Sequence, residues 1–137
     1  MKGDTFDRLP PEIRKGIKVF YGSYDAEVPE NILWQWTIMP LHALAEEVWK
    51  DPELNQAYPS FRSYHRWYTQ DHSWPPKWTK RDPDSVYPII LTGPPEGPYD
   101  PEKGVIDDGW NRFHWYIDRW GPRKRIPVVW PVGWKRK

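Results

Sequence analysis

The chain has 137 residues, which is enough to build one domain with its own hydrophobic core. Its formal net charge is only +1, so the protein as a whole exerts no long-range electrostatic attraction on nucleic acid. It has no cysteine, which excludes disulfides, thiolate chemistry and cysteine-based zinc sites, and its 11 Trp, 8 Tyr and 4 Phe predict a strongly aromatic core. No stretch approaches the roughly 18 apolar residues of a membrane span and the N-terminus lacks an apolar signal region, so we expect a cytoplasmic protein without a membrane partner.

Residues 1–32 are expected to form an N-terminal arm that packs on the core or on a neighbouring subunit, and residues 33–137 to form the domain itself. Within the arm, Pro10-Pro11-Glu12 is typical of a helix start, and Ile13 and Ile17 lie at the helical spacing of a buried face. Gly16 lies in the same stretch and lowers its helix propensity.

The first half of the domain predicts one strand followed by two helices. Residues 33–38 alternate in the manner of a half-buried strand. Residues 41–50 carry apolar side chains on one side of a helix, which ends before Asp51-Pro52. A second helix begins after Pro59, with Ser60 near its cap. Its aromatic face carries Phe61, Tyr64, His65 and Tyr68.

A loop over residues 69–84 is rich in proline and tryptophan, and its Trp74 and Trp78 fit no periodic pattern. Loops of that length inside a small domain are often functional. If both rings are exposed together, they form a surface for a protein partner or a nucleic acid. The alternative is that they complete the aromatic core.

The second half of the domain predicts an anion-binding turn. Residues 86–91 and 105–106 are apolar strands, which a Gly/Pro turn joins as antiparallel neighbours. Asp107, Asp108 and Gly109 then lead into a helix, with Asp108 as its N-cap, and residues 126–130 form a further strand. This order predicts a right-handed βαβ unit whose helix start offers free backbone amides to an anion or a phosphate.

The order of elements resembles the ParB/sulfiredoxin-like fold, an α/β (α+β) single domain with a small mixed sheet and packed helices. The resemblance covers residues 33–132 and rests on Pro40-Leu41-x-x-Leu44, Pro88-Ile89-Ile90-Leu91, Val105-Ile106-Asp107-Asp108-Gly109-Trp110-Asn111-Arg112-Phe113 and Ile126-Pro127-Val128-Val129. Members of this family bind nucleotide phosphates at the turn. They include plasmid-partitioning proteins that bind CTP and DNA, sulfiredoxins that use ATP, and small plasmid proteins with ATPase or DNase activity.

The resemblance implies a cofactor-binding segment at residues 109–112. Gly109 would let a phosphate approach the backbone, Asn111 and the amides of Trp110 to Arg112 would donate to it, and Arg112 would add positive charge. ATP or CTP is the ligand implied. Trp110 and Asn111 stand where the family usually has two histidines, and the missing cysteine excludes sulfiredoxin chemistry. The compact branch of ParB-like nuclease and ATPase proteins remains.

Each candidate residue has a structural alternative. Asp107 and Asp108 are Mg²⁺ ligands and catalytic carboxylates in one interpretation, and strand-end and capping side chains in the other. Arg112 binds phosphate or forms a salt bridge. His114 lies four residues before Asp118, so the pair is a general base or an ordinary contact on a helix surface.

Arg123, Lys124 and Arg125 begin a C-terminal segment without acids, which either contacts DNA phosphates or only favours solubility. We therefore expect a nucleotide- or nucleic-acid-phosphate-binding protein of a plasmid, phage or similar mobile element, and the resemblance implies phosphoester hydrolysis as the reaction if the protein is an enzyme. The alternative is a non-catalytic protein-interaction or inhibitor module that uses the Trp74–Trp78 loop.

Overall fold

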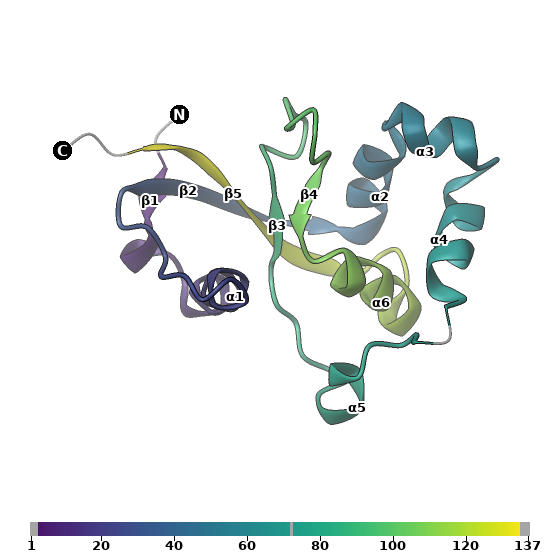
Figure 1. Ribbon diagram of the computed structural model, residues 1–137, viewed down its shortest axis with the longest axis horizontal. Coiled ribbons are helices and arrows are strands. Elements are labelled where there is room, and N and C mark those ends of the chain that lie inside the picture. The colour runs from purple at the N-terminus through teal and green to yellow at the C-terminus, as the bar shows by residue number, and fades with distance from the viewer. Residues whose placement is uncertain (1–2, 72, 135–137) are drawn as a thin grey trace.

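Five strands form one mixed sheet in the order β1-β2-β5-β3-β4, and helices pack on both of its faces (Figure 1). The computed structural model describes residues 3–71 and 73–134. The strands are β1 (Asp4–Thr5), β2 (Ile32–Pro40), β3 (Ile89–Leu91), β4 (Ile106–Asp108) and β5 (Arg125–Trp134). The helices are α1 (Pro11–Gly22), α2 (Leu41–Trp49), α3 (Pro52–Ala57), α4 (Phe61–Thr69), α5 (Trp78–Arg81) and α6 (Trp110–Trp120), with the 3-10 turn η1 (Phe6–Arg8). The predicted mixed α+β class is confirmed.

The strand directions correct the predicted βαβ unit. The predicted antiparallel pairing of β3 with β4 is confirmed, and β3 runs parallel to β5. Strands β4 and β5 therefore run in opposite directions and are separated by β3, so β4-α6-β5 is not a parallel crossover. The connection between β3 and β4, residues 92–105, reverses the chain direction, so β4 pairs antiparallel to β3.

The main core lies on one face of the sheet, beneath α2, α4 and α6. It contains alternate residues of β3 and β5, such as Ile89 and Val128, together with Leu44 of α2 and Phe113 of α6. All four side chains are fully buried. Helices α4 and α6, which carry many of the aromatic residues, pack on this core and lie side by side (Figure 1).

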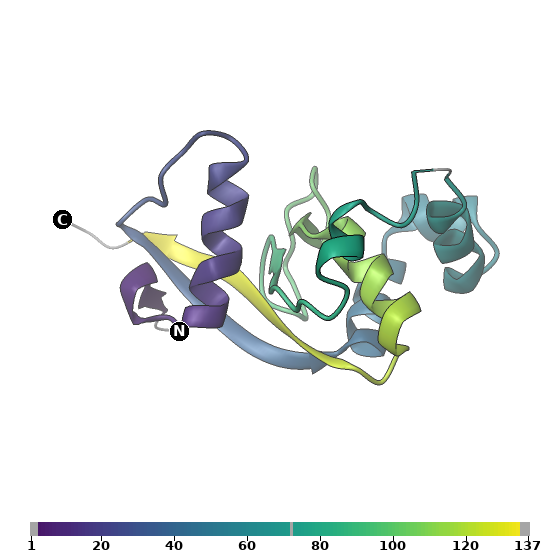
Figure 2. The ribbon, with the colours of Figure 1, turned by 90° about the horizontal axis from the view of Figure 1, so that it is seen from below.

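Helix α1 covers the other face of the sheet, where Ile17 packs with Trp34, Ile90 and Val129 in a second core. Figure 2 shows α1 lying across the long β2–β5 ribbon. Gly16 makes this contact close, because a Cβ at this position would lie 2.3 Å from Pro88 Cγ. Helix α1 thus packs on the sheet, and β1 adds an edge strand beside β2.

Two local expectations differ from the structure. Strand β3 begins only at Ile89, because Pro88 has no N–H to give to a ladder. Asp51-Pro52 not only ends α2 but also starts α3, since Asp51 Oδ1 accepts a hydrogen bond from Glu53 N at 2.9 Å and Pro52 takes the first helical position. Within the described residues, no helix is long and apolar enough to cross a membrane.

Candidate functional site

The turn between β4 and α6 is set by Gly109, which has a left-handed φ of 114° and takes the N-cap position of α6. A Cβ at this position would lie 3.3 Å from Ile89 Cγ1, so glycine is required by conformation and by space. The predicted N-cap role of Asp108 is wrong, because Gly109 occupies the cap and moves Asp108 one residue outward. Asp108 Oδ2 instead lies 3.3 Å from Arg112 Nη1.

The turn forms one wall of a pocket of about 280 Å³, the turn pocket. Its lining residues are Tyr68, Trp78, Asp107, Asp108, Gly109, Trp110, Asn111 and Arg112. All the residues that the sequence assigned to the turn therefore face one space. The first amides of α6 have no intrahelical acceptor, which gives this end of the helix a partial positive charge.

The charges around the turn pocket are mutually paired. Arg112 Nη1 lies 3.3 Å from Asp108 Oδ2 and 3.4 Å from the carbonyl oxygen of Pro88, while its guanidinium lies over the ring of Tyr87. Asp107 Oδ1 lies 3.5 Å from Lys103 Nζ. Arg112 thus forms a salt bridge and still lines the pocket, so its two predicted roles are not exclusive.

Two carboxylates and one guanidinium line the turn pocket, so its lining carries a net negative charge. A bare phosphate would be repelled, whereas a phosphate that arrives with Mg²⁺ would be compatible with Asp107 and Asp108. Across residues 3–71 and 73–134, no group of three or more His, Cys, Asp or Glu side chains is placed to hold a metal ion. Oxygen atoms of the ligand would therefore have to complete such a site.

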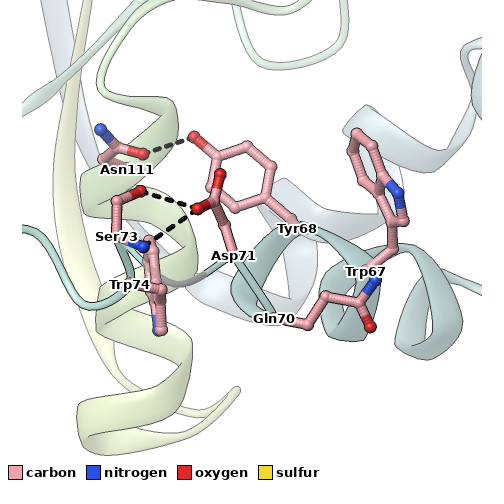
Figure 3. Close-up of a pocket in the computed structure, with 7 residues that line it drawn as sticks. All are labelled: Trp67, Tyr68, Gln70, Asp71, Ser73, Trp74 and Asn111. Atoms are coloured by element: carbon pink, nitrogen blue, oxygen red, sulfur yellow. Dashed lines mark hydrogen bonds between the residues drawn. The ribbon is translucent and has the colours of Figure 1, made fainter.

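A larger pocket of about 670 Å³ adjoins the turn pocket and is shown in Figure 3. The two pockets share Tyr68 and Asn111, whose side chains are joined by a hydrogen bond of 2.6 Å from Tyr68 Oη to Asn111 Oδ1. Rings of Trp67 and Trp74 line the larger pocket, and Trp67 is 53% exposed. The Tyr68–Asn111 hydrogen bond thus forms a bridge between the charged turn pocket and the aromatic rings of the larger pocket.

The two tryptophans of the predicted partner surface face different spaces. Trp74 lines the larger pocket, and Trp78 lines the turn pocket and packs against the main core. Both side chains are half-buried. They do not form one exposed patch, although each contributes an aromatic wall to a pocket.

The basic residues predicted to contact DNA lie at the other end of α6 from the turn, roughly 16 Å along the helix axis. Arg123 is exposed, Lys124 lies over the ring of Trp120, and Arg125 Nη2 donates to the carbonyl oxygen of Ile38 at 3.3 Å. The last basic residues, 135–137, lie outside the described part of the chain.

His114 is fully buried and lines neither pocket, so it cannot contact a ligand in either. The predicted contact with Asp118 is wrong, because His65 of α4 inserts between them. His65 Nε2 lies 2.7 Å from Asp118 Oδ1, and His65 Nδ1 lies 2.7 Å from His114 Nδ1. Trp74 Nε1 donates to the second oxygen of Asp118 at 3.2 Å. The four side chains form one polar chain between α4, α6 and the loop.

Burial and the neighbouring charge of His65 lower the pKa of His114 to about 3, so His114 is neutral at pH 7. A consistent tautomer assignment follows from the network. In the assignment with one proton on each imidazole, His65 Nε2–H donates to the Asp118 carboxylate and His65 Nδ1 accepts from His114 Nδ1–H. His114 Nε2 then accepts from Tyr64 Oη, 3.4 Å away.

The polar chain also supports the bridge between the pockets. The ring of Tyr68 stacks on that of His114 with 3.8 Å between the centroids. Burial raises the pKa of Tyr68, which keeps its hydroxyl protonated as the donor to Asn111. The sequence predicted His65 and Tyr68 only as members of an aromatic helix face. The one feature of the sequence that could have indicated their roles in the polar chain and in the bridge is that both carry polar atoms on that face.

Comparisons with known proteins add no family to this geometry. No protein-family model, no curated protein and no solved structure matches the chain. The resemblance to ParB/sulfiredoxin-like proteins remains a prediction, and the site has to be interpreted from its own side chains.

Proposed function

We propose that the protein binds a nucleotide across the turn pocket and the larger pocket. The observation that carries the proposal is that these pockets meet at Tyr68 and Asn111, with a helix start on one side and aromatic rings on the other. A nucleotide combines the two matching parts, since it has charged phosphates at one end and a flat aromatic base at the other.

The phosphate end is assigned to the turn pocket. Gly109 permits the turn that begins α6, and the first amides of the helix give this end a partial positive charge that favours a phosphate. Arg112 is held in place by Asp108 and Pro88, so it is pre-oriented to donate to a phosphate oxygen. Asp107 and Asp108 would hold the accompanying Mg²⁺, which neutralises phosphate charge.

The base is assigned to the larger pocket. At about 280 Å³ the turn pocket is smaller than the roughly 300–1,000 Å³ typical of sites for whole small molecules, whereas the larger pocket measures about 670 Å³. Trp67 and Tyr68 offer ring faces there, and stacking a base on an aromatic side chain contributes about 1–3 kcal/mol. His114 is out of reach, so phosphoester hydrolysis would rely on the Mg²⁺ that Asp107 and Asp108 would hold and not on a base supplied by His114.

Calorimetric titration with ATP and CTP, each with and without Mg²⁺, tests the proposal. We expect saturable binding that needs Mg²⁺ and becomes about tenfold weaker in Arg112→Ala, because one charge-assisted hydrogen bond is lost. Arg119→Ala is the matched control, since this exposed arginine of α6 pairs with Asp84 away from the turn. No saturable binding, or an equal loss in both variants, contradicts the proposal.

The interaction-module alternative was predicted for Trp74 and Trp78, which are half-buried and line different pockets. Among the residues of these two pockets, Trp67 has the more exposed ring that a protein partner could cover. Nucleotide binding that depends on Arg112 separates the two functions, because a protein partner seated on Trp67 has no need of the turn.

A further inference from the structure

A third pocket, the α1 pocket, lies on the opposite face of the sheet, between α1 and the β2–β5 ribbon that Figure 2 shows beneath it. Its volume is about 450 Å³. Phe20 and Tyr21 of α1, Trp34 of β2 and Ile90 of β3 supply apolar and aromatic walls. Such a concave, mostly apolar space with a few polar groups is typical of a small-molecule site.

One carboxylate gives the α1 pocket its charge. Asp107 lines it, and none of the described lining residues is a lysine or an arginine. Its side chain is 23% exposed, and its ion pair with Lys103 is long, at 3.5 Å. Burial, and secondly the negative charge of Asp107, raise the pKa of Tyr21, so the phenol stays neutral beside the carboxylate. A cation is the charge that complements this wall.

One donor in the wall lacks an acceptor. Trp34 is only 2% exposed, and its indole Nε1 has no hydrogen-bond partner in the described part of the chain. A buried donor without a partner is unfavourable, and native structures usually satisfy it. Nε1 itself is fully buried, so a ligand in the α1 pocket meets the ring of Trp34 and not this nitrogen.

We propose that the α1 pocket binds a small aromatic amine, whose protonated nitrogen pairs with Asp107 and whose ring lies among Phe20, Tyr21 and Trp34. The aromatic faces add cation–π attraction to the ion pair. Asp107 would repel an anionic ligand. An uncharged aromatic ligand would provide no positive charge to pair with the Asp107 carboxylate.

Three probes of similar shape separate these cases: tyramine, which is cationic, tyrosol, which is neutral, and phloretate, which is anionic. Each is titrated into the full chain labelled for two-dimensional proton–nitrogen NMR. We expect tyramine to saturate and to shift the indole N–H signal of Trp34, with tyrosol about tenfold weaker and phloretate inactive. The indole signals of Trp78 and Trp110 report the turn pocket and stay in place.

Asp107→Asn removes the charge at nearly constant shape, and we expect it to weaken tyramine about tenfold, to the level of tyrosol. Glu102→Gln is the matched control, because this exposed acid lies outside the pocket and should leave tyramine binding unchanged. Equal affinity for tyramine and tyrosol, unchanged binding in Asp107→Asn, or a shift of Trp78 and Trp110 in place of Trp34 overturns the proposal.

Discussion

Gly109 is the residue on which the geometry of the turn depends. Its φ of 114° is unfavourable for any side chain, and a Cβ would press against Ile89 at 3.3 Å. The same position leaves the amides of α6 open to a ligand. A single small substitution therefore tests the local structure and the site together.

We expect Gly109→Ala to lower the free energy of unfolding by about 1–2 kcal/mol, because alanine is strained at this φ. Chemical denaturation measures the change. Gly22→Ala is the control: it lies at the end of α1, and an added Cβ would meet no atom within 4 Å. An unchanged midpoint in Gly109→Ala contradicts the account of the turn.

His114 makes stability depend on pH in a direction that its pKa fixes. The pKa is about 6.5 in the unfolded chain and about 3 in the folded chain, so between these values only the unfolded chain takes up the proton. The contribution of neutral His114 to the free energy of unfolding is complete above about pH 6.5 and is lost as the pH falls toward 3. The expected slope is at most about 1.4 kcal/mol per pH unit.

Denaturation between about pH 7 and pH 4 measures this slope. His114→Asn should show a shallower dependence than the wild-type chain, besides lower stability. His42→Asn, which changes an exposed histidine on α2, should keep the wild-type slope. If the free energy of unfolding changes with pH by the same slope in all three proteins, a group other than His114 takes up the proton on unfolding.

At the scale of elements, α1 shows why local propensity and packing have to be weighed together. Glycine inside a helix costs about 1 kcal/mol relative to alanine, so propensity alone predicts that Gly16→Ala stabilises the protein. The structure predicts the opposite, because the new Cβ would lie 2.3 Å from Pro88 and push α1 off the sheet.

We therefore expect Gly16→Ala to lower the midpoint of thermal unfolding, with a cost of about 1–3 kcal/mol from overpacking. Gly22→Ala serves again as the control, since the propensity gain there meets no contact. A stabilised Gly16→Ala variant would show that α1 can shift on the sheet at little cost.

Elements with strong local signals were predictable from the sequence, and their relative placement was not. Alternation in β2 and the apolar spacing of α2 are local properties, so their positions were predicted within a few residues. The turn residues were also found, because a glycine between an acid pair and a helix is a local pattern. The antiparallel direction of β4 depends instead on how β3 and β5 pair.

The partners of the turn depend on contacts across the chain. Tyr68 reaches Asn111 from 43 positions away, and His65 reaches His114 from 49 positions away. No spacing rule links residues at such separations, so the aromatic wall and the polar chain could not be predicted. The sequence-based pairing of His114 with Asp118 used the nearest candidate, and packing of α4 supplied a better one.

At the scale of the whole molecule, the sheet joins two cores, with α1 on one face and α2, α4 and α6 on the other. Ile90 and Val129 face α1, whereas their neighbours Ile89 and Val128 face the main core. Strands β3 and β5 are shared by both. Neither core can lose its cover without exposing the strands on which the other is built.

Removal of residues 1–22 should therefore destabilise the entire chain. The deletion uncovers Trp34, Ile90 and Val129, and burying one such side chain contributes about 1.5–3 kcal/mol. We expect binding of a hydrophobic dye and a broad thermal transition, measured beside the full chain. A sharp transition close to that of the full chain would show that the main core is independent of α1.

Asp107, in strand β4, lines both the turn pocket and the α1 pocket. One carboxylate can be neutralised by one cation at a time. If Mg²⁺ with a nucleotide and an amine bind as proposed, each lowers the affinity of the protein for the other by the same factor, as thermodynamic linkage requires. The shared carboxylate would make the two ligands antagonists that never touch.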